Sequence, residues 1–80
     1  MTYLQFIFSQ ELYTARIRLN YTQAQVAESV SISLRWYQRL EKGVGDPTFP
    51  VAMALVALLG IDVQVLLKAV SFKDVQVSSN

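Results

Sequence analysis

The sequence of 80 residues contains no cysteine and no histidine. Without cysteine there is no disulfide and no thiolate that could bind a metal ion. Without histidine, a Cys/His zinc site and a histidine-based catalytic triad are both excluded. The six carboxylates are scattered, with no pair at the spacing of an acid/base couple, and nothing obvious activates a serine or threonine. We therefore expect that the protein is not an enzyme and has no catalytic residue, no metal site and no cofactor.

Targeting segments and membrane-spanning runs are lacking too. The opening MTYLQFIF is apolar but has neither a basic start nor a small-residue cleavage site, so we expect no secretory signal. The longest apolar run, over residues 49–61, is too short to cross a bilayer and is interrupted by a proline and a glycine. We expect one domain over residues 1–80, with a core over 10–69 and a tail over 71–80, in the cytoplasm.

Net charge is small, at +1 for the whole chain. Taken alone, this gives weak support for nucleic-acid binding. The distribution of charge is more informative, because five basic residues and two acidic residues lie between positions 16 and 42. The bases are Arg16, Arg18, Arg35, Arg39 and Lys42, and the acids are Glu28 and Glu41. Basic residues alone would favour a merely solvated helix face, so their structural context decides the interpretation.

Residues 22–30 predict a short amphipathic helix. Thr22 is a good N-cap, and Gln25 three positions later completes a capping box, in which two backbone N–H groups receive side-chain partners. At 100° per residue, Val26, Ala27 and Val30 fall on one narrow stripe, and the polar residues fall on the other side. This stripe predicts that one face of the helix is buried.

Residues 33–43 predict a second short helix with two separate faces. Ser33 can cap its start, and Gly43 stands where a helix commonly ends in a left-handed residue. One face carries Leu34, Arg35, Gln38, Arg39 and Lys42, and the opposite face carries Trp36, Tyr37 and Leu40. Arginine and glutamine on the exposed side of a short helix can read base edges in the major groove of DNA.

The remaining segments also predict helices. Thr2 and Gln5 form another capping-box pattern, and a helix over residues 2–19 would have two apolar stripes, one with Leu4 and Leu12 and one on the opposite side with Phe6, Tyr13 and Ile17. The alternative is a short strand over residues 3–8, followed by a shorter helix that Ser9 caps. We favour the long helix.

Two further helices follow a turn rich in glycine and proline. Thr48 can cap a helix that runs to Gly60, and its residues 49–59 contain no polar side chain, so this helix must be covered on more than one side. Asp62 can cap a last helix over about 63–69. The tail over residues 71–80 is compatible with a strand or a loose end.

The ordered set of these residues resembles the Xre/Cro-like, phage-repressor type of helix-turn-helix regulators. The resemblance covers roughly residues 12–67. Its elements are Leu12, Arg16, Thr22, Gln23, Ala27, Ile32, Ser33, Tyr37, Leu40, Glu41, Gly43, Asp46, Pro47, Thr48, Leu55, Leu59, Gly60, Ile61, Leu66 and Leu67. Three positions depart from the family pattern: Ser31 and Asn20 stand where glycine is usual, and Tyr37 replaces an isoleucine or valine. Ser31 affects the expected turn geometry most.

The resemblance implies an all-α, five-helix DNA-binding domain whose third helix enters the major groove. On this basis we expect the DNA-binding residues to be Gln23, Ser33, Leu34, Arg35, Gln38, Arg39 and Lys42. Within this set, the resemblance implies that Gln23 touches a phosphate. It also implies that Arg16 and Glu41 form a structural pair beneath the DNA-facing surface.

We interpret the chain as a sequence-specific regulator of transcription, most simply a repressor, that binds double-stranded DNA in a bacterial or phage-encoded setting. The apolar surplus of the helix over 49–59 predicts a homodimer through the last two helices and the terminal segments. The alternative is a protein-interaction or antitoxin-type helix-turn-helix subunit in which DNA binding is weak or secondary.

Overall fold

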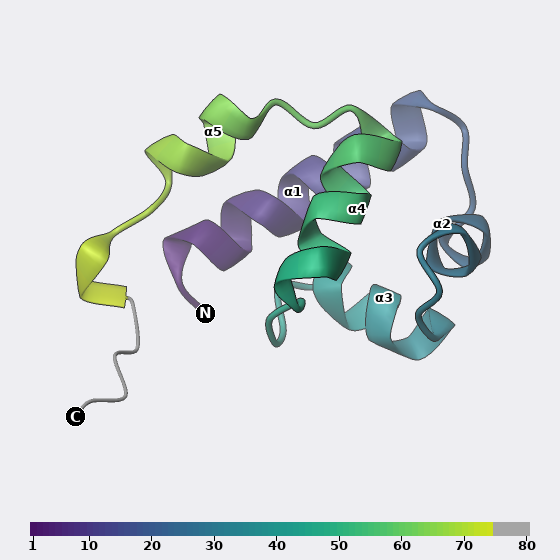
Figure 1. Ribbon diagram of the computed structural model, residues 1–80, viewed down its shortest axis with the longest axis horizontal. Coiled ribbons are helices and arrows are strands. Elements are labelled where there is room, and N and C mark those ends of the chain that lie inside the picture. The colour runs from purple at the N-terminus through teal and green to yellow at the C-terminus, as the bar shows by residue number, and fades with distance from the viewer. Residues whose placement is uncertain (75–80) are drawn as a thin grey trace.

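The computed structural model describes residues 1–74, and these form five α-helices and a short 3-10 helix (Figure 1). The α-helices are α1 Tyr3–Arg18, α2 Gln23–Ser29, α3 Leu34–Glu41, α4 Phe49–Leu59 and α5 Val63–Lys68. The 3-10 helix, η1, is Phe72–Asp74. The expected all-helical architecture is confirmed, and so is the long first helix. Residues 71–80, for which the sequence left a strand or a loose end open, are described only as far as this 3-10 turn.

Side-chain caps define where each α-helix begins. Thr2 with Gln5 and Thr22 with Gln25 form complete capping boxes, with all four backbone-to-side-chain distances between 2.8 and 3.0 Å. Single N-caps open the other three α-helices, at Ser33, Thr48 and Asp62. Each cap gives an otherwise unpaired backbone N–H an acceptor, so the polar residues between the apolar runs fix the start of every α-helix.

The first three helices end with the same backbone motif. A residue with positive φ follows each of them: Asn20 at 62°, Ser31 at 61° and Gly43 at 77°. The next N–H then bonds back to a carbonyl three residues before the cap, as in the 3.0 Å bond from Ile32 to Ala27. This is the Schellman arrangement, which reverses the chain tightly at a helix end.

Helix α1 is the centre of the fold and contacts α3, α4 and α5. The largest fully buried side chains come from α1, α2, α3 and α4. They are Tyr37, Leu12, Leu55, Leu59 and Val26. Trp36 packs against this core while it remains half-exposed. The core thus joins α2 and α3 to α1 and fixes the orientation of the helix-turn-helix.

The helix over residues 49–59 was expected to be covered on more than one side, but within one chain part of its surface stays uncovered. On α4, Phe49 is 76% exposed and Met53 is 41% exposed, although Leu55 and Leu59 are buried. On α1, Phe6, Tyr13 and Ile17 are all at least 44% exposed. Among the described residues, no helix is long and apolar enough to cross a membrane.

Candidate nucleic-acid interface

The turn between α2 and α3 brings the two helices into direct contact. Ser31 bonds to the carbonyl of Glu28 at 3.2 Å, and its left-handed backbone redirects the chain. Ile32 then lies half-buried against the core, and Ser33 Oγ accepts the N–H of Trp36 at 3.0 Å to start α3. The turn therefore forms with serine at the position where the sequence departs from the family pattern.

An exposed arc on α3 and its cap carries five of the seven residues expected to bind DNA. These are Ser33, Leu34, Arg35, Arg39 and Lys42, and each is exposed to solvent. Leu34 is 43% exposed. Arg18 lies away from this arc, at the end of α1, and donates to the carbonyl of Leu59 at the end of α4 at 3.4 Å. The arc thus concentrates Arg35, Arg39 and Lys42 on one surface.

The other two expected DNA-binding residues, Gln23 and Gln38, are half-buried and bonded to each other. Gln38 Nε2 donates to Gln23 Oε1 at 3.2 Å. Gln23 Nε2 in turn donates to Glu41 Oε1 at 3.0 Å. The two amides therefore link α2 to α3, and neither faces solvent as freely as the arginines do.

Arg16 and Glu41 lie together beneath this surface as a bidentate ion pair. Arg16 Nε is 2.5 Å from Glu41 Oε2, and Nη2 is 3.1 Å from Oε1. The side chains are only 10% and 6% exposed, and Arg16 Nη1 also donates to the carbonyl of Tyr21 at 3.0 Å. Two parallel bonds from a planar guanidinium fix both distance and orientation, so α1 holds the C-terminal end of α3 in place.

Tyr37, on the face of α3 opposite the arc, is a further member of this network. Its ring is fully buried, and its hydroxyl donates to Glu41 Oε2 at 2.6 Å. A buried tyrosine hydroxyl needs a hydrogen-bond partner, and Glu41 lies one helical turn away. The tyrosine in place of the usual aliphatic residue was the available signal. Glu41 therefore accepts bonds from Arg16, Gln23 and Tyr37, which come from three helices.

The network shifts the acidity of its members in opposite directions. Burial alone would raise the pKa of Glu41, but the bonds from Arg16, Tyr37 and Gln23 outweigh it and hold that pKa below its ordinary value of 4.5. The bond to Glu41 raises the pKa of Arg16 against the opposing effect of burial. Burial, followed by the bond to Glu41, raises the pKa of Tyr37 well above its ordinary value. At neutral pH the pair is thus ionised on both sides and Tyr37 is protonated.

Comparison with known proteins agrees with this geometry. A family model described as helix-turn-helix matches residues 12–66, which is more than half of the chain. The chain belongs to the Xre/Cro-like helix-turn-helix family. No curated protein and no solved structure matched the chain in the corresponding searches.

The family match includes the helix-turn-helix, the ion pair and most of the core. It excludes residues 1–11, which contain the N-terminal part of α1 and the exposed aromatic residues Tyr3 and Phe6. Within residues 1–74, no group of three or more metal-ligating side chains comes together. The exposed arc of α3 offers hydrogen-bond donors and positive charge on one helix.

Proposed function

We propose that the protein binds double-stranded DNA sequence-specifically and acts as a transcriptional repressor in the cytoplasm of a bacterium, encoded by the bacterium or by a phage. The observation that supports this most is the exposed arc of Arg35, Arg39 and Lys42 on a helix whose end is fixed by a buried ion pair. This support holds the backbone of α3 in place before DNA arrives, so binding does not have to order the helix itself.

In the proposed complex α3 enters the major groove and α2 crosses the backbone. Arg35 and Arg39 can each form two bonds to guanine O6 and N7, and Leu34 can contact a thymine methyl group. Lys42 lies at the end of α3 and supplies a point charge for a phosphate. Gln38 and Gln23 are already bonded to each other, and each keeps hydrogen-bonding groups that this bond does not use. Gln38 would use them at the edge of an adenine, and Gln23 would use them at a phosphate.

Selection of binding sites from a random DNA pool tests the assignment. The variants Arg35→Ala and Arg39→Ala should each relax the preference at one base pair per half-site, with a loss of roughly 1–3 kcal/mol for the selected site. Arg18→Ala is the matched control, because it removes the same charge away from the arc. If the wild type and both arc variants select the same motif with equal stringency, neither arginine reads bases.

We also propose that the protein is a homodimer through α4, α5 and the terminal segments. An apolar groove of about 700 Å³ runs between the start of α1, α4 and α5. On its edges Phe49 and Leu67 are 76% and 56% exposed, and Phe72 nearby is 90% exposed. Each phenylalanine can bury about 150–250 Å², so the two phenylalanines supply roughly half of the about 800 Å² per partner of a standard interface.

A protein-interaction or antitoxin-type role is the second candidate, and one observation favours it. Helix α1 keeps a stripe of exposed apolar residues on the face opposite the core, with Tyr13 52% and Ile17 51% exposed. Such a stripe fits a protein partner better than it fits DNA. Retardation of DNA that weakens steeply with salt supports the regulator, whereas its absence supports the interaction module.

A further inference from the structure

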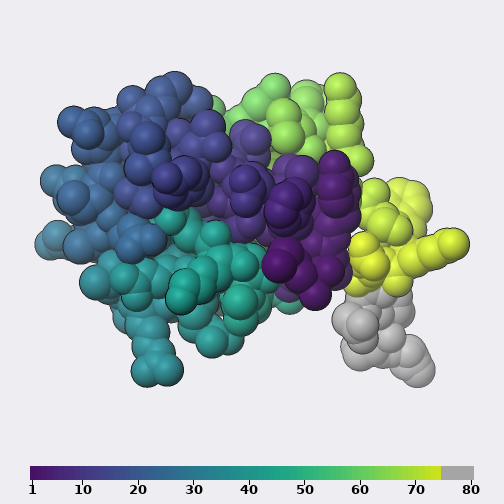
Figure 2. Space-filling model, turned by 180° about the vertical axis from the view of Figure 1, so that it is seen from behind, coloured from purple at the N-terminus to yellow at the C-terminus, as the bar shows by residue number. Residues whose placement is uncertain are grey.

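The first turn of α1 contacts the loop between α3 and α4. Gln5 Nε2 donates to Asp46 Oδ1 at 2.7 Å and approaches the carbonyl of Gly45 at 3.4 Å. In the space-filling view the N-terminal end of α1, in purple, lies against the teal segment that continues from α3 (Figure 2). These contacts join positions about 40 residues apart in the sequence.

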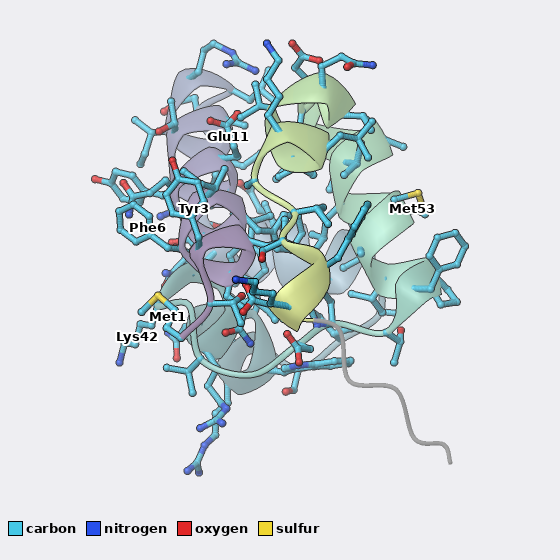
Figure 3. The ribbon with its side chains drawn as sticks, turned by 90° about the vertical axis from the view of Figure 1, so that its left-hand side faces the viewer. Met1, Tyr3, Phe6, Glu11, Lys42 and Met53 are labelled. Carbon is cyan, nitrogen blue, oxygen red and sulfur yellow. The ribbon has the colours of Figure 1, made fainter. Side chains whose placement is uncertain are left out.

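Met1 adds an apolar contact to the same loop. A Cβ atom on Gly43 would come within 2.8 Å of the sulfur of Met1 and 3.6 Å of Ser9 Oγ, so both side chains pack directly on the glycine backbone. The stick view shows Met1 beside Lys42, at the end of α3 (Figure 3). Gly43 is buried although it stands in a loop.

The loop needs such support because of its composition. Gly43 and Gly45 both have positive φ, at 77° and 79°, and glycine loses more conformational freedom on ordering than any other residue. The loop also abuts the DNA-facing arc, because a Cβ atom on Gly45 would lie 3.9 Å from Arg39 Nη2. Disorder in the loop would therefore spread to the surroundings of Arg39 and Lys42.

We propose that the N-terminal turn of α1 is a brace that holds the α3–α4 loop in its DNA-binding position, with Gln5 as the positioning residue. This inference rests on the proposed DNA-binding function. Gln5 uses both ends of its amide: Oε1 accepts the N–H of Thr2 at 2.8 Å in the capping box, and Nε2 holds Asp46. Met1 and Gln5 lie outside the matched residues 12–66, whereas the loop that they contact lies inside them.

Because Gln5 both accepts a bond from Thr2 and donates one to Asp46, the proposal can be tested by exchanging the donor and the acceptor between Gln5 and Asp46. Gln5→Glu keeps an acceptor for the capping box but replaces the donor to Asp46 with a second carboxylate. Adding Asp46→Asn restores a donor and acceptor pair in the reverse sense and returns the net charge to that of the wild type. Gln10→Glu, an exposed position on the same helix, is the matched control for the added charge.

Two measurements decide the proposal at a temperature where every variant is folded. In hydrogen exchange, the Val44 amide, which bonds to the carbonyl of Arg39 at 3.0 Å, should exchange about three- to tenfold faster in Gln5→Glu. The affinity for a labelled duplex that carries the site selected by the wild type should fall by a similar factor. The double variant should restore both values, and Gln10→Glu should leave both near those of the wild type.

Unchanged exchange at Val44 in Gln5→Glu overturns the brace. Faster exchange with unchanged DNA affinity overturns the positioning role, and so does a failure of the double variant to restore binding. If the wild type selects no duplex at all, the proposed function fails, while the exchange measurement still decides whether Gln5 orders the loop. The two failures are thereby distinguished.

Discussion

At the scale of the residue, Ser31 has the most costly backbone. Its φ of 61° lies in the left-handed region, which costs a residue with a Cβ atom about 1–2 kcal/mol. Ser31→Gly should therefore raise the free energy of unfolding by about 1 kcal/mol, since glycine adopts this conformation freely. A thermal melt should show a midpoint about 4–8 °C higher.

Ser29→Gly is the control for this substitution, because Ser29 is the last residue of α2 and its hydroxyl donates to the carbonyl of Gln25 at 2.8 Å within that helix. There glycine should lower the stability by about 0.5 kcal/mol. Opposite signs at two serines separated by one residue would identify the backbone of the turn as the cause. A loss of stability in Ser31→Gly would instead mean that the serine side chain stabilises the turn.

Glu41 is the residue on which the buried network depends most. Glu41→Gln removes the charge opposite Arg16, which is 9% exposed and has no other carboxylate partner in the part of the chain described. We expect a loss of about 3 kcal/mol in denaturant unfolding. Glu28→Gln, an exposed position on α2, should change the stability by less than about 0.5 kcal/mol. An unchanged midpoint for Glu41→Gln would contradict the structural role of the pair.

The acidity of Glu41 predicts how this loss depends on pH. Because its pKa is lower in the folded state than the ordinary 4.5, the unfolded state binds a proton first as the pH falls. The stability that Glu41 contributes is therefore complete above pH 4.5 and disappears as the pH drops through the folded pKa. The difference between wild type and Glu41→Gln should be constant near neutrality and shrink in acid. A difference that grows in acid would contradict a lowered pKa of Glu41 in the folded state.

The roles of single residues were only partly predictable from the sequence. Arg16 and Glu41 were expected to meet, and they do so in the structure. The bond from Gln38 to Gln23 was not anticipated, because a helical wheel gives the face of a residue but not the reach of its side chain toward another helix. For the same reason the sequence placed Tyr37 on the face opposite the arc but did not predict the bond from its hydroxyl to Glu41.

At the scale of the element, the five α-helices and their caps were predictable because each begins with a short polar side chain at a fixed offset from an apolar pattern. The contact of Gln5 with Asp46 was not predictable. It depends on how the first turn of α1 projects beyond the core, and that projection is set by the packing of α1 on α3 and α4.

The C-cap residue of α3 leads to a prediction about how DNA binding depends on salt concentration. Lys42 is exposed at the C-cap of α3, and we propose that it contacts a phosphate. Lys42→Ala should weaken binding to all DNA sequences about equally and reduce the slope of log affinity against log salt by about one. Lys68→Ala, an exposed lysine at the end of α5, is the matched control. A sequence-dependent loss for Lys42→Ala would show that it reads bases.

At the scale of the whole molecule, two apolar surfaces compete as the dimer interface. Leu67 in the groove and Ile17 on the outer stripe of α1 are almost equally exposed, at 56% and 51%. Leu67→Glu should convert the proposed dimer to a monomer of 9.0 kDa, whereas Ile17→Glu should leave it intact. Sedimentation equilibrium at micromolar concentration measures both, and the reverse outcome would move the interface to α1. A monomeric wild type would refute the dimer.

The position of Trp36 gives the molecule an intrinsic optical label. It is the only tryptophan in the chain, and it lies half-buried on α3 between the core and the exposed arc. Any change in tryptophan emission therefore originates at the recognition helix, without a dye or an engineered probe. Unfolding would move the indole fully into water, and occupancy of the arc would change the polarity on its outer side. One fluorescence channel can thus follow both the folding of this domain and the filling of its binding surface.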